Sequence, residues 1–292
     1  MSPLLLYPLL TIVPAGILAA TVKVWRWLED FKGPRMPVTD RLLRSPGETA
    51  RRNAEKLDDK ATDILIWVLA LPATLLVSSM APRLIELRPI PGFWTFVLIA
   101  LAAAFVLTLG RFIALLKDRD NWRLDFSGER AVGEELNMLM LEGCRVFHDF
   151  PLAENGNINH VVVAPSGVYA IETKAKRKLK SSASQKAHEV VYDGKGLQFP
   201  HSYEREDTVQ AKKQAERLGQ FLCAAVRSPV PVNPVLTLPG WYVISKRTGD
   251  VTVLNPKQIE SLVLGGGPPA LSPERIRQIA RHLDQRCRDV EF

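Results

Sequence analysis

Glu172 and Lys174 are the two residues in this sequence best suited to chemistry on a phosphodiester. They lie two positions apart at the end of an apolar segment that is expected to be a strand, so both side chains should point to the same face. A carboxylate can hold a divalent cation, and a lysine beside it can orient or help deprotonate a water on that cation. Because Glu-x-Lys is also common on protein surfaces, the pair alone is weak evidence of function.

A second carboxylate, Glu134, lies in a helix expected to begin after Ser127 and Gly128 and to end near Gly143. Three other residues share its stripe of that helix: Ala131, Met138 and Leu141. An adjoining stripe is apolar, and it contains Val132, Leu136 and Leu139. A carboxylate on such a face either reaches a partner or suffers a large desolvation cost. The alternative is a carboxylate at the rim of the helix, paired with an arginine.

A run of basic residues follows Glu172, and no acid appears before Glu189. The run contains Lys174, Lys176, Arg177, Lys178, Lys180 and Lys186. Clustered lysine and arginine residues are typical of phosphate contact, which predicts nucleic-acid binding at Lys176, Arg177, Lys178 and Lys180. A solvated loop explains the run equally well.

Three segments are informative when taken together: Gly-Glu-Glu-Leu at 133–136, Asn-Ile-Asn-His-Val-Val-Val at 157–163, and Pro-Ser-Gly-Val-Tyr-Ala-Ile-Glu-Thr-Lys at 165–174. In combination they resemble the nuclease-related domain family, NERD. Gln210 matches a glutamine of that family, and the resemblance covers about residues 125–225. It implies the PD-(D/E)XK nuclease superfamily, with a central sheet, flanking helices and a Mg²⁺-dependent site.

The resemblance also implies roles for individual residues. Glu134, Asn159 and Glu172 would be the metal ligands, while Lys174 and Gln210 would join Glu172 in catalysis. Asn159 departs from the pattern, since the family has an aspartate there. An amide oxygen can ligate a hard cation but brings no charge, and ligand charge largely determines affinity for Mg²⁺.

Two functions follow from these observations. The first is a membrane-anchored nuclease that hydrolyses the phosphodiesters of nucleic acid with Mg²⁺. The second is a catalytically degenerate module that binds nucleic acid or a protein at the membrane without cutting. The retained Glu172 and Lys174 favour the first function, whereas Asn159 favours the second.

The expected fold is α/β, with membrane helices followed by a mixed-sheet, restriction-endonuclease-like domain with flanking helices. Residues 118–292 are expected to fold by themselves as one domain, with strands at about 144–152, 158–164 and 168–173. A helix over 208–226 and a terminal helix from 272 to about 287 should pack beside the sheet. Cys144, Cys223 and Cys287 are scattered, which argues against a zinc site and against a disulfide framework.

Residues 1–117 contain three uncharged apolar runs, at about 3–22, 64–82 and 89–110. Each is close to the 20 or so residues that a helix needs to cross a bilayer. The first run has no preceding lysine or arginine, which favours a retained helix over a cleaved signal peptide. None of the runs contains Asp, Glu, Lys, Arg or His, so they are expected to anchor the chain in lipid rather than form a transport path.

The orientation follows from the loops between the runs. Ten lysine and arginine residues lie in 23–63, whereas Arg83 and Arg88 alone lie between the second and third runs. Cytoplasmic loops carry the basic excess. We therefore expect the N-terminus outside and the C-terminal domain in the cytoplasm, as in a bacterial inner-membrane protein.

Overall fold

The structure, a computed structural model, describes residues 41–84, 92–152, 156–178, 188–265 and 269–290, together with residues 16, 20, 21, 24, 25 and 28. The chain divides into two compact units. The first comprises Met1–Pro37 and Asn53–Asn121, and the second comprises Val38–Arg52 and Trp122–Phe292. The domain boundary expected near residue 118 stays a prediction, and the second unit additionally contains a segment from before the expected boundary.

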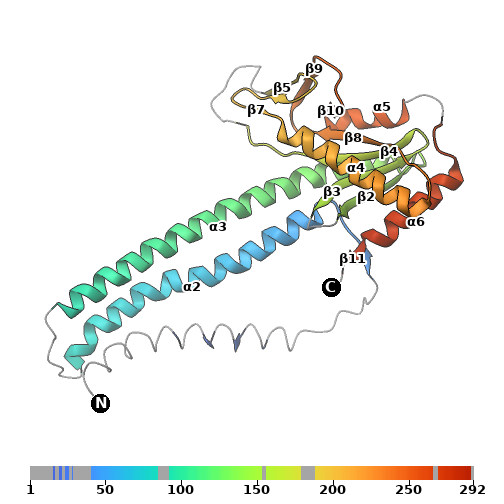
Figure 1. Cartoon of the computed structure of the whole chain (residues 1–292). Coiled ribbons are helices and arrows are strands. Elements are labelled where there is room, and N and C mark those ends of the chain that lie inside the picture. The colour runs from blue at the N-terminus through green and yellow to red at the C-terminus, as the bar shows by residue number, and fades with distance from the viewer. Residues whose placement is uncertain are drawn as a thin grey trace. The chain divides into compact units, whose positions relative to one another are not determined.

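A five-stranded mixed sheet forms the centre of the second unit, in the order β10-β8-β4-β3-β2 (Figure 1). β2 (Arg145–Pro151), β3 (Asn157–Ala164) and β4 (Gly167–Thr173) are antiparallel neighbours, as the turn residues between them predict. β8 (Val232–Thr237) and β10 (Thr252–Leu254) then add in parallel. β3 and β4 are almost continuously buried, because both faces of the sheet are covered.

Helices cover both faces of this sheet. α4 (Glu206–Val226) and α6 (Pro273–Cys287) pack on one face through residues such as Leu218, Leu222 and Ile279. On the other face, the last turns of α3 (Phe93–Met138) and the short α5 (Ile259–Leu264) contribute the buried Val132, Leu136 and Val263, among others. The expected α/β fold with a mixed sheet and flanking helices is therefore confirmed.

A second, four-stranded sheet has the order β7-β6-β5-β9. It consists of β7 (Tyr203–Glu204), β6 (Leu197–Gln198), β5 (Glu189–Tyr192) and β9 (Tyr242–Ser245). Its core includes Phe199 and Trp241, whose rings meet edge to face at 5.1 Å between centroids. This sheet borders the chain that leaves β4 after Lys174, because the Trp241 indole N–H donates to the Lys176 carbonyl at 3.3 Å.

The segment before α2 (Glu48–Leu84) belongs to the second unit. β1 (Leu42–Leu43) pairs with β11 (Arg288–Val290), and Arg44 lies between two carboxylates. Its guanidinium donates to Asp149 Oδ2 at 2.9 Å and to Asp289 Oδ1 at 2.6 Å. Asp149 is completely buried and also accepts hydrogen bonds from the Thr49 N–H and hydroxyl, at 3.1 and 2.7 Å.

The first unit contains most of α2 and the first part of α3. Within the described chain, one helix is long and apolar enough to cross a membrane, at Leu98–Met138, with a mean hydropathy of 2.3 in its most apolar window and none of that window buried. The expected second run lies in α2, where the side chains beyond residue 68 are not described. Apart from residues 16, 20 and 21, the first run lies outside the described residues. Three membrane spans therefore remain a prediction.

Candidate active site

Glu172 lies near the end of β4 and is 6% exposed. Two glutamines from successive turns of α4 hold it. Gln210 donates its amide N–H to Glu172 Oε1 at 2.6 Å, and hydrogen bonding from Gln214 lowers the pKa of the same carboxyl. Glu172 Oε2 is buried without a hydrogen-bond partner among the described residues. One carboxylate oxygen is thus held by α4. The other has no partner in the described part of the chain, so a cation or a hydrogen-bond donor would stabilise it.

Asn159 precedes His160, which pairs with Ile171 at the end of the ladder between β3 and β4, so the register continues toward Glu172. Its Oδ1 accepts the backbone N–H of Thr173 at 2.8 Å. Since that N–H can only donate, it determines which way the amide is turned. The amide N–H₂ is left for Glu129, to which Asn159 is hydrogen-bonded.

Glu129 is the second carboxylate of this site. It lies in α3 and is 5% exposed, and its Oε2 has no hydrogen-bond partner among the described residues. The helix can approach the end of β4 because residue 128 is glycine: a Cβ there would lie 2.6 Å from the Cβ of Ala175. Glu129 and Glu172 are close enough for the charge of Glu172 to raise the pKa of Glu129.

Two buried carboxylates, an asparagine between them, and a lysine after the strand form an arrangement suited to phosphodiester chemistry. Comparison with known families finds a match over part of the chain. Residues 124–239 match the nuclease-related domain, NERD. No curated protein and no solved structure matches the chain. The segment resembling this family, expected over about 125–225, is thus found within the NERD match.

Glu134 does not join the other predicted residues of the NERD segment. Its side chain is 67% exposed, and its Oε1 accepts from Arg130 at 3.2 Å on the outer face of α3. Ala131, Met138 and Leu141 are exposed as well, so the whole stripe chosen from the sequence faces solvent. Glu134 therefore fits the alternative of a carboxylate at the rim of the helix. The buried carboxylate of α3 beside the sheet is Glu129.

Lys174 lies beyond the end of β4, with 36% of its side chain exposed. Its Nζ is 3.5 Å from Asp207 Oδ1 in the first turn of α4. Its charge lowers the pKa of Glu172 and of Asp125, so the ammonium faces the same cluster of carboxylates. Glu172 and Lys174 are therefore directed to one side, as their spacing predicts.

The basic run has a more mixed placement. Lys176 is paired with Glu204 and with Asp207, and its ammonium lies 4.6 Å from the centroid of the Phe199 ring. Lys178 is exposed and lies over the Trp241 ring at 5.5 Å, and Arg177 is exposed. Lys180 lies outside the described residues. Lys176 is therefore paired with carboxylates of the NERD segment itself. Fewer cations of the run are then available for phosphate contact than the sequence suggests.

Burial dominates the electrostatics of the two carboxylates. It raises the pKa of Glu129 to about 8, with smaller contributions from the charges of Asp149 and Glu172, while the Asn159 hydrogen bond acts in the opposite direction. Burial raises the pKa of Glu172 to about 7, against the hydrogen bond from Gln214 and the charge of Lys174. Without a cation, both groups therefore retain protons near neutral pH.

These pKa values predict how stability depends on pH in EDTA. An unfolded glutamate titrates near 4.3, so above that value the folded protein binds more protons than the unfolded chain, and the free energy of unfolding falls as pH rises until Glu129 has titrated near 8. The buried His148 and His160 have lowered pKa values, so their destabilising protonation acts below about pH 6.5.

The window from pH 6.5 to 8 therefore isolates the glutamates. As pH rises through this window, we expect the free energy of unfolding to fall by up to about 1.4 kcal/mol per pH unit for each proton released. Hydrogen exchange of the β3 and β4 amides, corrected for intrinsic rates, measures it in the full-length chain. Glu129→Gln should flatten the profile, and an unchanged slope in that variant would contradict the assignment of a raised pKa to Glu129.

Glu129 could have been found from the sequence. It lies three residues before Val132 and is in phase with Leu136 and Leu139, so it extends the apolar stripe that packs on the sheet. The family-like Gly-Glu-Glu-Leu segment drew attention to Glu134 instead. The role of Asp207 carried no comparable signal, because its contacts with Lys174 and Lys176 join residues about thirty positions apart.

Proposed function

We propose that the NERD segment, residues 124–239, is a metal-dependent nuclease site with Glu129 and Glu172 as its two carboxylates. The observation that carries this proposal is that each glutamate keeps one buried oxygen without a hydrogen-bond partner among the described residues. The two lie close enough to repel each other electrostatically. Burying two such carboxylates is costly unless a cation or proton compensates them.

The residues present fit Mg²⁺. This ion commonly binds through one or two carboxylates and keeps several waters or phosphate oxygens. In the described part of the chain, no group of three or more His, Cys, Asp or Glu residues is arranged to hold a metal, so a cage made entirely of protein ligands is not what supports the proposal. When bound, Mg²⁺ supplies charge neutralisation at the phosphate and a more acidic water.

The surrounding residues have distinct tasks in this proposal. Gln210 holds Oε1 of Glu172, and hydrogen bonding from Gln214 lowers the pKa of the same carboxyl. Lys174 is half-exposed at the same cluster, where its ammonium can hold a phosphate oxygen or the attacking water. Asn159 positions Glu129 by donating an amide N–H to its carboxylate, while the Thr173 N–H holds the amide in that orientation.

A specific observation supports the second function, a module that binds nucleic acid without cutting it. Both polar ends of the Asn159 amide are already used, by Thr173 and by Glu129. Asn159 therefore acts as a hydrogen-bond donor to a carboxylate, and it adds no negative charge for a cation. A site with two charges rather than three should bind Mg²⁺ more weakly.

We also propose that the domain is tethered to a lipid bilayer and faces the cytoplasm. α3 is one continuous helix that contains both the apolar window and Glu129. Large apolar side chains in its first part are highly exposed, including Phe96 at 71% and Leu107 at 69%. Such a surface is better accommodated in hydrocarbon than in water. The basic loop over 23–63 supports the orientation.

The function is tested with the full-length chain in detergent, by Mg²⁺ titration and by cleavage of labelled DNA and RNA strands. Glu129→Gln and Glu172→Gln should each weaken Mg²⁺ binding and lower the cleavage rate by about 100-fold or more, because each removes a charge that stabilises the bound cation.

Glu134→Gln is the matched control, since it makes the same change five residues along the same helix on an exposed face. It should leave both measurements unchanged. If the unaltered chain binds nucleic acid and Mg²⁺ accelerates no cleavage, the non-cutting function is favoured. A loss in Glu134→Gln equal to that in Glu129→Gln would contradict the site described here.

A further inference from the structure

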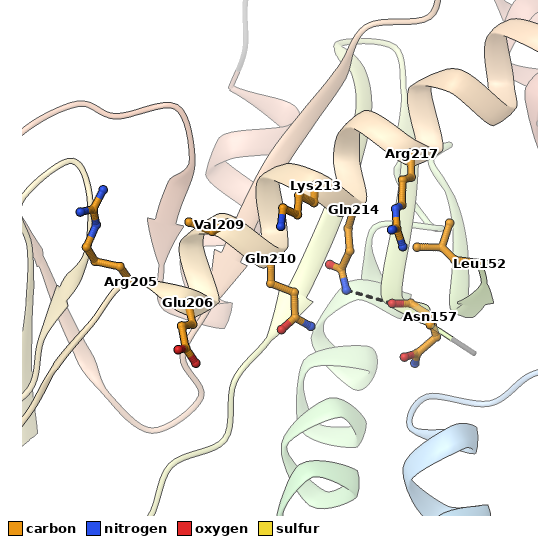
Figure 2. Close-up of a pocket in the computed structure, with 10 residues that line it drawn as sticks. Leu152, Asn157, Arg205, Glu206, Val209, Gln210, Lys213, Gln214 and Arg217 are labelled. Atoms are coloured by element: carbon orange, nitrogen blue, oxygen red, sulfur yellow. Dashed lines mark hydrogen bonds between the residues drawn. The ribbon is translucent and has the colours of Figure 1, made fainter. Parts of the chain in front are cut away.

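A groove of about 630 Å³ runs along α4 beside the proposed site. Residues one helical turn apart on α4 line one side, and Leu152, Gly156 and Asn157 line the other (Figure 2). Gln210 and Gln214 belong both to this groove and to the contacts of Glu172. The groove is therefore connected to the buried carboxylate through two glutamine side chains.

The charged side chains that line the groove are mostly cationic. Among the described residues that line it, Arg205, Lys213 and Arg217 are the cations and Glu206 is the one acid. Lys213 and Arg205 are exposed, and Lys213 makes no ion pair within the described ranges. Lys213 and Arg217 are four residues apart, about 6 Å along the helix, so they can contact neighbouring anionic groups of one extended ligand.

The groove also contains a buried acceptor. Gln214 is 7% exposed, and its Nε2 donates to the Asn157 carbonyl at 2.9 Å, which fixes the orientation of the amide. Its Oε1 has no hydrogen-bond partner among the residues that the structure describes. A ligand complementary to this side of the groove would carry an N–H or O–H donor for Gln214 Oε1 and negative charge for the cations.

We propose that this groove binds one unpaired nucleic-acid strand, with its phosphates against Lys213 and Arg205 and a base or sugar donor at Gln214 Oε1. The inference rests on the proposed function and names the surface that presents the strand to Glu172. A single strand carries phosphates and also exposes donors that a duplex keeps paired. The groove, rather than the run after Lys174, then supplies the main phosphate contacts.

The test measures binding of a labelled single-stranded oligonucleotide to the full-length chain in EDTA, so that cleavage does not interfere. Lys213→Ala should weaken binding about fivefold or more and reduce the slope of log K against log salt by about 0.7. Lys212→Ala is the matched control, because Lys212 is the neighbouring lysine on the same helix and pairs with Asp250 at 2.6 Å. It should change neither quantity.

Glu206→Gln gives a result of opposite sign. It removes the acid from the groove and should tighten binding, an outcome that loss of folding cannot imitate. The proposal is overturned if Lys213→Ala and Arg205→Ala bind as the unaltered chain does, or if duplex binds more tightly than single strand. If these variants weaken binding but the unaltered chain never cleaves nucleic acid, strand binding in the groove is supported and the proposed nuclease activity is contradicted. A chain that binds no oligonucleotide would overturn both.

Discussion

Arg44→Ala should destabilise the second unit by about 3–5 kcal/mol, the cost of leaving a buried charge without its partner. Arg44 is 11% exposed and Asp149 is completely buried, and they form an ion pair at 2.9 Å. The substitution leaves Asp149 with the neutral donors of Thr49 and Asn157 but no cation. Asp149 also holds a left-handed φ of 52°, a strained conformation that these contacts maintain.

The control for this prediction lies in the same segment. Arg52→Ala also removes an arginine from an ion pair, but Arg52 is 35% exposed and pairs with Glu48 beside it. Its loss should cost no more than about 1 kcal/mol. Hydrogen exchange of the β2 and β3 amides in the full-length chain reports both variants. Equal protection in the two variants would show that Arg44 does not stabilise the sheet.

The Arg44–Asp149 ion pair also affects whether residues 118–292 can fold by themselves, as the sequence predicts. That fragment lacks Arg44, Thr49 and β1, so it would leave Asp149 and Asp289 without partners that the structure gives them. No sequence pattern could indicate this, because Arg44 and Asp149 are 105 residues apart and the intervening helices have their own hydrophobic signal. Long-range ion pairs of this kind need the fold before they can be recognised.

Local patterns predicted the central strands well. The turn residues at 154–157 and 165–167 delimit β3, and the valine-rich run between them is typical of a strand buried on both faces. The link between Glu172 and Gln210 was indicated by resemblance, and the structure brings the two side chains to 2.6 Å. Their positions follow from the order of the strand and the helix along the chain.

Periodicity was ambiguous for α3. Two adjoining stripes each contain apolar residues, one with Met138 and Leu141 and the other with Leu136 and Leu139. Which stripe packs on the sheet depends on the close approach at Gly128, a tertiary contact. The contacts of Lys176 likewise depend on the fold. Its partner Asp207 lies on α4, so the sequence alone shows this lysine only as a member of a basic run.

Asn159→Asp should produce the most informative change at the proposed site. The new side chain can keep one oxygen on the Thr173 N–H, but the other replaces a donor that faces Glu129. In EDTA, above pH 8, three carboxylates would then lie together in a buried region, and we expect a loss of about 3 kcal/mol in the free energy of unfolding. Below about pH 4, where the glutamates are protonated in both folded and unfolded chains, most of that loss should vanish.

Mg²⁺ should reverse the sign of this effect. A third carboxylate strengthens binding of a hard cation, so Asn159→Asp should raise the affinity for Mg²⁺ by about tenfold or more. Saturating Mg²⁺ should then restore the stability of the variant. Glu172→Gln in the same background should abolish the gain, because the two groups would share one cation. If Asn159→Asp destabilises the protein equally with and without Mg²⁺, Asn159 serves only to hold Glu129 and Thr173 in place. The site would then bind no metal, and the non-cutting function would be preferred.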